Sequence, residues 1–281
     1  MIIFNSVSKG FGETKALTDF SLTVEKGSAT ALLGHNGAGK STALNILLGQ
    51  IAQDAGEVSI EGLTLHRARA FVGGLAQVTG FPFNIKVGEL VEFVKAHYKN
   101  GPSSAELAKV FDLDSIWGRY ATELSGGQAR RLGVAMALAG EHRYLVLDEP
   151  TTGLDPLSQR HLWSVFKTFN TLGGTLLFTT HDIVEAEELA TDVAVLAQGK
   201  LLAKGPVQAM KSLYCKDVVL FKLKQTYDFP LDLDVHVGRG QVTITGDADS
   251  IVRKLVEYNV PFEGLAVERA SMEALYGSSH S

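Results

Sequence analysis

The stretch that decides the fold is GHNGAGKS at residues 34–41. It fits the phosphate-binding pattern G-x-x-x-x-G-K-[ST], in which small residues let backbone N–H groups surround phosphates and the following helix adds its N-terminal dipole. Lys40 supplies a mobile positive charge, and the Ser41 hydroxyl can ligate Mg²⁺. The competing dinucleotide fingerprint fails, because Gly39 is followed by Lys rather than by x-x-Gly. We therefore predict a nucleotide-binding loop with contacts from Gly34, His35, Asn36, Gly37, Ala38, Gly39, Lys40, Ser41 and Thr42.

The segments around this loop indicate an α/β sheet with one shared site. Strand-like apolar runs occur at 29–33 (ATALL), 144–147 (YLVL), 175–179 (TLLFT) and 193–196 (VAVL). Three of them lead into polar loops, which read GHNGAGKST, DEPTTGLD and THD. Ligands gather at the carboxyl ends of the strands in a mostly parallel sheet, so we expect these loops to meet at one site.

Two further regions differ from this strand-and-loop pattern. Apolar positions at helical spacing over 82–120, with a turn at residues 100–102, predict a helical insert at about 82–140. Its alternative interpretation is a pair of helices that simply pack on the sheet. After residue 205 the sequence predicts a strand, a hairpin turning at 238–240, a helix, and a final strand and short helix in GLAVERASMEALY. We expect a main domain over 1–205 and a small α+β domain over 206–281.

Composition excludes several classes of protein. Of 281 residues, 45% are hydrophobic and 20% are charged, which is ordinary for a folded chain and excludes bulk disorder. Lys and Arg total 26 against 31 Asp and Glu, so the net charge of −5 gives no support for coating nucleic acid. The single Cys215 can form no internal disulfide and is interpreted as a small buried residue. The sequence has no signal-peptide-like start and no apolar run of about 18 residues, so we expect a cytoplasmic protein without its own membrane span.

The second chemical motif is YLVLDEP at 144–150. An aspartate at the end of a buried apolar strand is costly unless it meets a cation or hydrogen-bond donors. Asp148 is therefore a candidate Mg²⁺ ligand, and Glu149 can polarise the water that attacks a terminal phosphate. Two acids on a strand-end turn are common by themselves, but with the phosphate loop they indicate nucleotide hydrolysis.

The third motif is LSGGQ at 124–128, followed by the helical segment ARRLGVAMALAG. A serine and two glycines ahead of a helix expose N–H groups at the positive end of its dipole, which favours an anion. The same residues are also compatible with an ordinary helix N-cap.

Taken together, these motifs resemble the nucleotide-binding subunit of an ABC transporter. LSGGQ lies between GHNGAGKST and YLVLDEP, and it is followed by GLD at 153–155 and by His181 after TLLFTT; the resemblance covers residues 1–205. It implies a P-loop NTPase fold of the ABC type, with a mostly parallel core sheet and a helical insert, joined here to the C-terminal α+β appendage.

The resemblance also assigns roles across a dimer. ABC ATPases form head-to-tail dimers in which ATP lies between the phosphate loop of one subunit and the LSGGQ of the other. A second copy of this chain is therefore an expected partner, and Mg²⁺ and ATP are the expected ligands. The residues implied to contact the nucleotide of the other copy, or to line that interface, are Ser125, Gly126, Gly127, Gln128 and Asp155.

Three more residues match family positions. Phe11 stands where the family places an adenine-stacking aromatic, and its alternative is a buried place at the sheet edge. Gln77 resembles the Q-loop residue, implied to contact Mg²⁺ and water, although the compact 61–77 segment leaves its register open by a residue or two. His181 resembles the switch histidine that contacts the γ-phosphate with Glu149, and a structural hydrogen-bond role is its alternative. The implied catalytic residues are Lys40, Gln77, Glu149 and His181, and the implied metal ligands are Ser41, Gln77 and Asp148.

The resemblance implies an ATPase that converts ATP and water to ADP and phosphate, and that drives a separate polytopic membrane permease from its cytoplasmic face by dimer closure. The tail segment ERASMEALYG resembles the end of ABC-2-type export ATPases. These include the ATPase for copper-site maturation of nitrous oxide reductase, which would add a periplasmic accessory protein as partner. One alternative is a soluble ABC-type ATPase that acts on nucleic acid or ribosomes, but the chain has neither a long coiled coil nor a second cassette. Another is a binding module without turnover, against which Glu149 argues.

Overall fold

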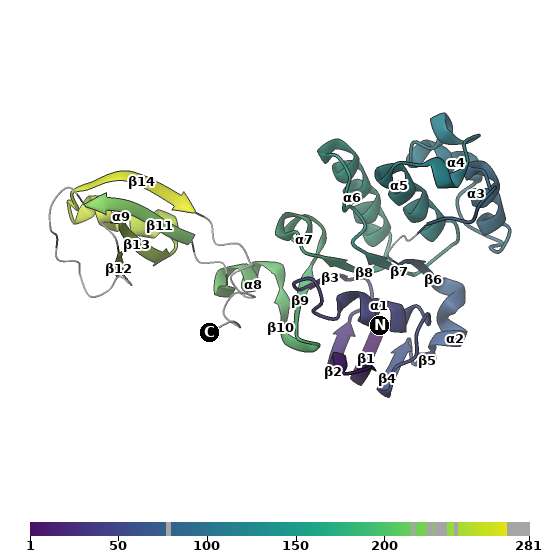
Figure 1. Ribbon diagram of the computed structural model, residues 1–281, viewed down its shortest axis with the longest axis horizontal. Coiled ribbons are helices and arrows are strands. Elements are labelled where there is room, and N and C mark those ends of the chain that lie inside the picture. Colours follow the sequence, from purple (N-terminus) through teal and green to yellow (C-terminus); the bar gives the residue numbers. More distant parts are fainter. Residues whose placement is uncertain (77–79, 215–216, 224–226, 228–234, 239–240, 269–281) are drawn as a thin grey trace. The chain divides into compact units, whose positions relative to one another are not determined.

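The computed structural model describes residues 1–281 apart from 77–79, 215–216, 224–226, 228–234, 239–240 and 269–281 (Figure 1). The chain divides into two compact units, Met1–Val207 and Gln208–Ser281. Gln77 and Cys215, both singled out from the sequence, lie outside the described residues. Among the helices of the described part, none is long and apolar enough to cross a membrane.

A six-stranded sheet forms the centre of the first unit, in the order β10-β9-β3-β8-β7-β6. All pairs from β9 to β6 are parallel, and β10 pairs antiparallel with β9. Every residue of β3, β7 and β8 is buried, which explains why their sequences are continuous apolar runs rather than alternating ones. The four predicted strands are all present, and the mostly parallel α/β fold is confirmed. The bounds are β3 (Ala29–Leu33), β6 (Val72–Leu75), β7 (Tyr144–Asp148), β8 (Thr175–Thr180), β9 (Asp192–Ala197) and β10 (Lys200–Pro206).

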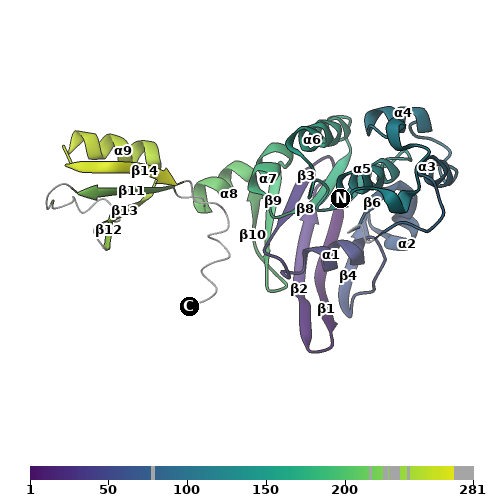
Figure 2. The same ribbon diagram turned by 45° about the horizontal axis from the view of Figure 1, so that its top comes forward.

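A second, antiparallel sheet was not predicted from the sequence. Its order is β2-β1-β4-β5, and it consists of β1 (Ile2–Phe11), β2 (Thr14–Val24), β4 (Ala55–Ile60) and β5 (Leu63–Thr64). The apolar side chains of β1, β2 and β4 share one core with helix α1 (Lys40–Leu47) and with side chains of the parallel sheet. The helix that follows the phosphate loop is thus held between two sheets, as Figures 1 and 2 show. This packing fixes the position of its N-terminus.

Further helices of the first unit flank the parallel sheet. Two follow strands of that sheet: α6 (Pro156–Thr171) and α7 (Ile183–Leu189). Asp155 caps α6, because its side chain accepts hydrogen bonds from the backbone N–H groups of Leu157 and Ser158, and Pro156 occupies the first turn. A short helix, α2 (Leu65–Ala68), precedes a 3₁₀ turn at Arg69–Phe71.

The predicted insert contains three helices, α3 (Val87–Lys95), α4 (Ser104–Val110) and α5 (Gly126–Ala137), which gather at one end of the unit in Figure 1. Short 3₁₀ turns lie between them at Asp114–Ile116 and Ala121–Glu123. Both α4 and α5 begin with a capping box, formed by Ser103 with Glu106 and by Ser125 with Gln128. The N-cap alternative for LSGGQ is therefore present in the folded chain, at the start of a 12-residue helix.

The second unit is a small α+β structure. Its sheet has the order β12-β13-β11-β14, with β11 (Asp217–Leu223), β12 (Val235–Gly238), β13 (Gln241–Gly246) and β14 (Phe262–Glu268). Helix α9 (Ala248–Glu257) packs Ile251 and Leu255 against Val219 and Phe221 of the sheet. Helix α8 (Val207–Tyr214) begins at the unit boundary. The residues 239–240 of the predicted hairpin turn, and the final predicted helix, lie outside the described residues.

Candidate active site

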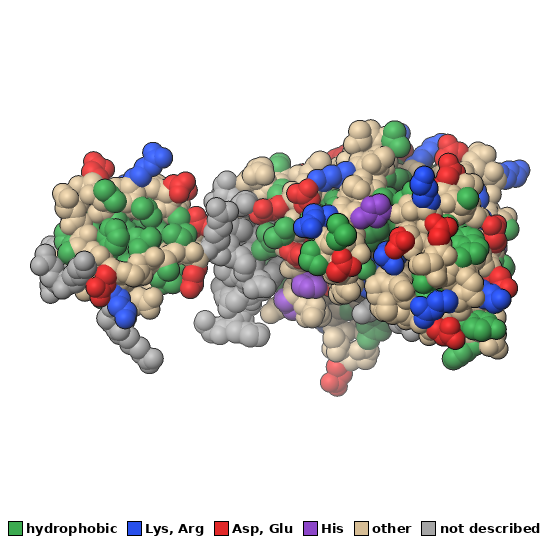
Figure 3. Space-filling model, turned by 90° about the horizontal axis from the view of Figure 1, so that it is seen from above, with side chains coloured by type: hydrophobic (Ala, Val, Ile, Leu, Met, Phe, Trp, Pro, Cys, Tyr) green, Lys and Arg blue, Asp and Glu red, His purple; other side chains and the backbone are tan. Residues whose placement is uncertain are grey.

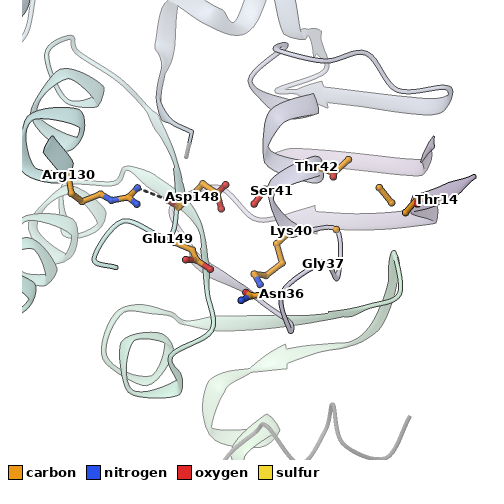
Figure 4. Close-up of a pocket in the computed structure, with 11 residues that line it drawn as sticks. Thr14, Asn36, Gly37, Lys40, Ser41, Thr42, Arg130, Asp148 and Glu149 are labelled. Carbon is orange, nitrogen blue, oxygen red and sulfur yellow. Dashed lines mark hydrogen bonds between the residues drawn. The ribbon is translucent and has the colours of Figure 1, made fainter. Parts of the chain in front are cut away.

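A cavity of about 440 Å³ opens at the carboxyl ends of β3 and β7 (Figure 4). The loop and first turn of α1 line one side of it, and the end of β7 lines the other. In the close-up, the side chains of Lys40, Asp148 and Glu149 point toward a common space. The lining residues are Thr14, Ala16, Asn36, Gly37, Gly39, Lys40, Ser41, Thr42, Arg130, Asp148 and Glu149.

The loop adopts its shape because glycine stands where other residues cannot. A Cβ on Gly34 would lie 2.4 Å from the backbone oxygen of Leu196, and one on Gly39 would lie 2.4 Å from that of Ala16. Gly39 also has φ +107°, a left-handed conformation that side chains disfavour. The loop therefore packs directly on neighbouring backbone, and its free N–H groups at the start of α1 are suited to a phosphate.

Lys40 is almost fully buried within this loop. Its Nζ donates hydrogen bonds to the backbone oxygens of Gly34 (2.6 Å) and His35 (3.2 Å). Burial lowers the pKa of Lys40, and the nearby carboxylates of Glu149 and Asp148 oppose that shift. A positive charge is thus held over the loop that would receive phosphates.

Asp148 has the features of a metal ligand. Its carboxyl group is buried at the end of β7, where Oδ1 accepts a hydrogen bond from the Thr179 hydroxyl. Its second oxygen, Oδ2, is buried and has no hydrogen-bond partner among the described residues. A buried carboxylate oxygen without a donor is costly unless a cation neutralises it. With the Ser41 hydroxyl in the same cavity, the donor set consists of oxygens and suits a hard cation such as Mg²⁺.

Glu149 is held in an unusual conformation beside this site. Its φ of +46° is rare for a residue with a side chain, and its backbone N–H donates to the Thr179 hydroxyl at 2.8 Å. Its carboxylate accepts a hydrogen bond from Thr152 Oγ1 (3.1 Å) and lies 3.2 Å from Nδ1 of His181. The acid after β7 and the histidine after β8 therefore meet in the folded chain.

The LSGGQ residues lie outside this cavity, since none of Ser125, Gly126, Gly127 or Gln128 lines it. Ser125 and Gly126 are exposed at the N-terminus of α5. Asp155 likewise lies elsewhere, and its carboxylate accepts hydrogen bonds from Ser158 Oγ and from two backbone N–H groups. These bonds lower the pKa of Asp155. Within one chain, the LSGGQ residues and Asp155 therefore lie outside the cavity of the phosphate loop.

Phe11 is half-exposed and does not line the cavity, so its alternative interpretation as a buried edge residue is wrong. It lies at the end of β1, with Lys9 Nζ 5.5 Å from its ring centre. An adenine-stacking role stays a prediction. Of the predicted loop residues, Gly34, His35 and Ala38 contribute loop backbone without lining the cavity. Gln77 lies outside the described residues.

Sequence reasoning missed three residues that shape the site. Thr179 bridges the two acids, and it lies opposite Asp148 in the parallel register of β7 and β8, so strand alignment could have identified it. Arg130 of α5 reaches the cavity and donates to the Asp148 backbone oxygen at 3.2 Å. Burial lowers the pKa of Arg130, while Asp148 and Glu149 oppose the shift. Thr14, at the start of β2, had no signal in the sequence.

The fold and the site define a P-loop nucleotide-binding protein, and comparison with known proteins narrows the class. The family model for the ABC transporter matches residues 17–152. The Nod factor export ATP-binding protein I of Paraburkholderia xenovorans (strain LB400) is 36% identical over 220 residues, which cover 74% of this chain and 72% of that protein. The chain belongs to the family of ABC transporter ATP-binding subunits.

Solved structures agree with this assignment. The dimeric structure of a post-hydrolysis state of the ATP-binding cassette MJ0796, bound to ADP and Pi, matches with a TM-score of 0.67 and 25% identity over 74% of this chain and 99% of that one. A bacterial Atm1-family ABC exporter with ATP bound matches with a TM-score of 0.65 and 25% identity, over 75% of this chain and 39% of the exporter.

Proposed function

We propose that the chain binds Mg-ATP and hydrolyses it as one half of a head-to-tail dimer that drives a membrane transporter subunit. This proposal rests on one observation: Lys40, Asp148 and Glu149 line the same cavity, and Oδ2 of Asp148 has no hydrogen-bond partner among the described residues. A cation, a metal-ligand oxygen and a base are the parts that phosphoryl transfer to water requires.

Each residue has a distinct task in this reaction. The loop N–H groups and Lys40 bind the phosphates of ATP. Ser41 and Asp148, which line the cavity, are proposed Mg²⁺ ligands, and Gln77 is a third that rests on the family resemblance alone. Bound Mg²⁺ neutralises charge on the phosphates. Glu149 takes a proton from the attacking water, whose oxygen forms a bond to the γ-phosphorus as the bond to the bridging oxygen of ADP breaks. His181, in contact with Glu149, orients the water and the γ-phosphate.

The proposed dimer rests on the LSGGQ residues, which do not line the cavity of their own chain. Ser125 and Gly126 expose a helix N-terminus that no phosphate bound in the same chain's cavity can use, because they do not line it. A second copy arranged head to tail would bring this N-terminus, with Gly127 and Gln128, onto the γ-phosphate held by Lys40. Asp155 would lie near the same interface. The MJ0796 cassette, to which this chain is similar, forms a dimer in its post-hydrolysis structure, which supports a dimeric arrangement.

The decisive experiment compares ATP binding and turnover in Glu149→Gln. We expect ATP binding to persist, steady-state ATPase activity to fall by about a hundredfold or more, and an ATP-bound dimer to accumulate in size-exclusion chromatography. Glu57→Gln, an exposed glutamate of β4, is the matched control and should behave like wild type. Wild-type turnover in Glu149→Gln would disprove the general-base role, and absence of ATPase activity in the wild-type protein would disprove the proposed function.

The partner is proposed to be a polytopic permease, with the chain held on the cytoplasmic face of the membrane. Phe83 and Phe93, at the start of the insert and on α3, are 86% and 61% exposed and offer apolar contacts to a partner. The name of the Nod factor relative favours export as the direction of transport. Copper-site maturation of nitrous oxide reductase, with a periplasmic accessory protein, is a narrower prediction that rests on GHNGAGK and on the tail segment 268–277.

A pull-down of tagged protein from detergent-solubilised native membranes tests the partner. We expect a stoichiometric polytopic protein in wild type and its loss in Phe83→Ser, with Leu172→Ser as the control at an exposed apolar side chain. A co-purifying periplasmic metalloprotein factor would support the copper assignment. Recovery with ribosomes or nucleic acid would favour the soluble alternative instead. On the face of the first unit seen in Figure 3, acidic and basic side chains are interspersed, which gives that alternative no electrostatic support.

A further inference from the structure

Glu185 of α7 is a buried carboxyl group that the mechanism above does not use. Only 2% of the residue is exposed. Its Oε1 accepts hydrogen bonds from Thr151 Oγ1 at 2.6 Å and from Trp163 Nε1 at 3.2 Å. Burial raises its pKa, and the hydrogen bonds to the carboxyl group oppose the shift.

Glu185 and its two donors belong to three segments around the catalytic pair. Thr151 stands two residues after Glu149, and the turn that holds it is closed by the bond from Thr152 N–H to the Glu149 backbone oxygen. Glu185 lies on α7, which begins two residues after His181. Trp163 lies on α6, the helix capped by Asp155. The carboxyl group of Glu185 therefore joins the loop after β7 to α6 and to the helix that follows His181.

We propose that Glu185 is a positioning residue for ATP hydrolysis, which fixes the loop of Glu149 against the loop of His181. This inference rests on the proposed ATPase function. The Glu149–His181 contact, at 3.2 Å, spans two loops whose strand ends are joined by Thr179. Beyond the strand ends, the Thr151–Glu185 bond ties the Glu149 loop to α7, the helix that follows His181. If that tie is lost, the acid and the histidine can separate, and displacements of about 1 Å reduce rates strongly without removing a reacting group.

The burial itself supports a positioning role. A buried ionisable group with several polar partners gives little net stability, because desolvation offsets its hydrogen bonds. The geometry that a carboxyl group adds here is the orientation of the Thr151 hydroxyl, two residues after Glu149, and of the Trp163 indole.

The test uses two buried threonines with matched chemistry. Thr151→Val removes the hydroxyl that donates to Glu185 and keeps the shape of the side chain. Thr175→Val removes a hydroxyl at the amino end of β8, away from the cavity, where it accepts the Gly27 N–H at 2.8 Å. We expect kcat for ATP to fall by about tenfold in Thr151→Val with an unchanged KM, and both values to remain near wild type in Thr175→Val. Equal kcat values in the two variants would overturn the proposal.

A second pair of variants distinguishes the loss of positioning from the loss of the fold. In Glu185→Gln, the remaining amide oxygen can still accept both the Thr151 and the Trp163 bonds, which share Oε1. We expect Glu185→Gln to keep kcat within about threefold of wild type and Glu185→Ala to lose at least as much as Thr151→Val. If Glu185→Gln is as inactive as Glu185→Ala, the positioning role is wrong. If wild type itself hydrolyses no ATP, the proposed function fails instead, so the two failures are distinct.

Discussion

Strands β7 and β8 carry polar groups at their amino ends and at their carboxyl ends, but the hydrogen bonding of these groups differs between the two ends. At the amino ends, Tyr144 donates to Glu61, the Met1 ammonium donates to both of them, and Thr175 accepts the Gly27 N–H. At the carboxyl ends, Thr179 joins Asp148 to Glu149, yet one oxygen of Asp148 has no partner within the described chain. The first network is closed, whereas the second leaves one buried oxygen open in the residue that lines the cavity, as the proposed metal ligand requires.

Asp148→Asn should show the largest effect and sharpen this contrast. The amide cannot supply a negative charge, so we expect ATPase activity to fall by about a hundredfold or more. Because the substitution also removes a buried charge whose Oδ2 has no hydrogen-bond partner among the described residues, the denaturation midpoint should be unchanged or higher without Mg-ATP. Activity assays and urea titrations measure both quantities. A large loss of stability would mean that Asp148 is part of a closed network after all.

Ser125→Arg should abolish ATP-driven dimerisation and reduce turnover by about tenfold or more, because the side chain blocks the proposed contact with the other copy. Ser103→Arg is a close control, since Ser103 opens the same type of capping box on α4. Both changes should cost about 1 kcal/mol of stability through the lost cap. Light scattering with ATP separates them, and a dimer in Ser125→Arg would contradict the cross-subunit site.

Tyr144→Phe probes the closed end. It removes the hydroxyl between Glu61 and the Met1 ammonium, and we expect a loss of about 1 kcal/mol in the free energy of unfolding with kcat unchanged. Tyr120→Phe, at a half-exposed tyrosine, should leave both quantities unchanged. A fall in kcat in Tyr144→Phe would show that the two ends of the sheet are coupled.

The smallest effect is a pH dependence at the same end. The hydrogen bond from Tyr144, and then that from the Met1 ammonium, lower the pKa of Glu61 below its ordinary value of 4.5. Its contribution to stability is therefore complete above pH 4.5 and is lost as the pH falls through the lowered value. The Tm difference between wild type and Glu61→Gln should be small, since the side chain is partly exposed, and should vanish below that window. A difference that grows on acidification would contradict this sign.

The elements that could be predicted from the sequence were those marked by a continuous run of one residue type or by a contiguous motif. The fully buried strands appear as apolar runs, and the glycine loop follows one of them directly. The antiparallel sheet was missed because β1 and β2 alternate imperfectly: their pairing shifts register three times, and Ser6 and Asp19 adopt positive φ. Arg130 was missed for another reason. Its side chain reaches from α5 to the end of β7, and only the tertiary packing of the insert brings the two together.

The backbone of Glu149 has a consequence for the evolution of this chain. A glutamate at φ +46° costs on the order of 1 kcal/mol or more relative to a residue that accepts this conformation readily. Glycine or asparagine at this position would therefore stabilise the fold while removing the proposed base. A lineage released from the need for turnover would be drawn toward such substitutions, because most sequences stay only just above the stability that folding requires. Under the proposed function, the chain therefore carries a conformational cost at the very residue assigned as its base.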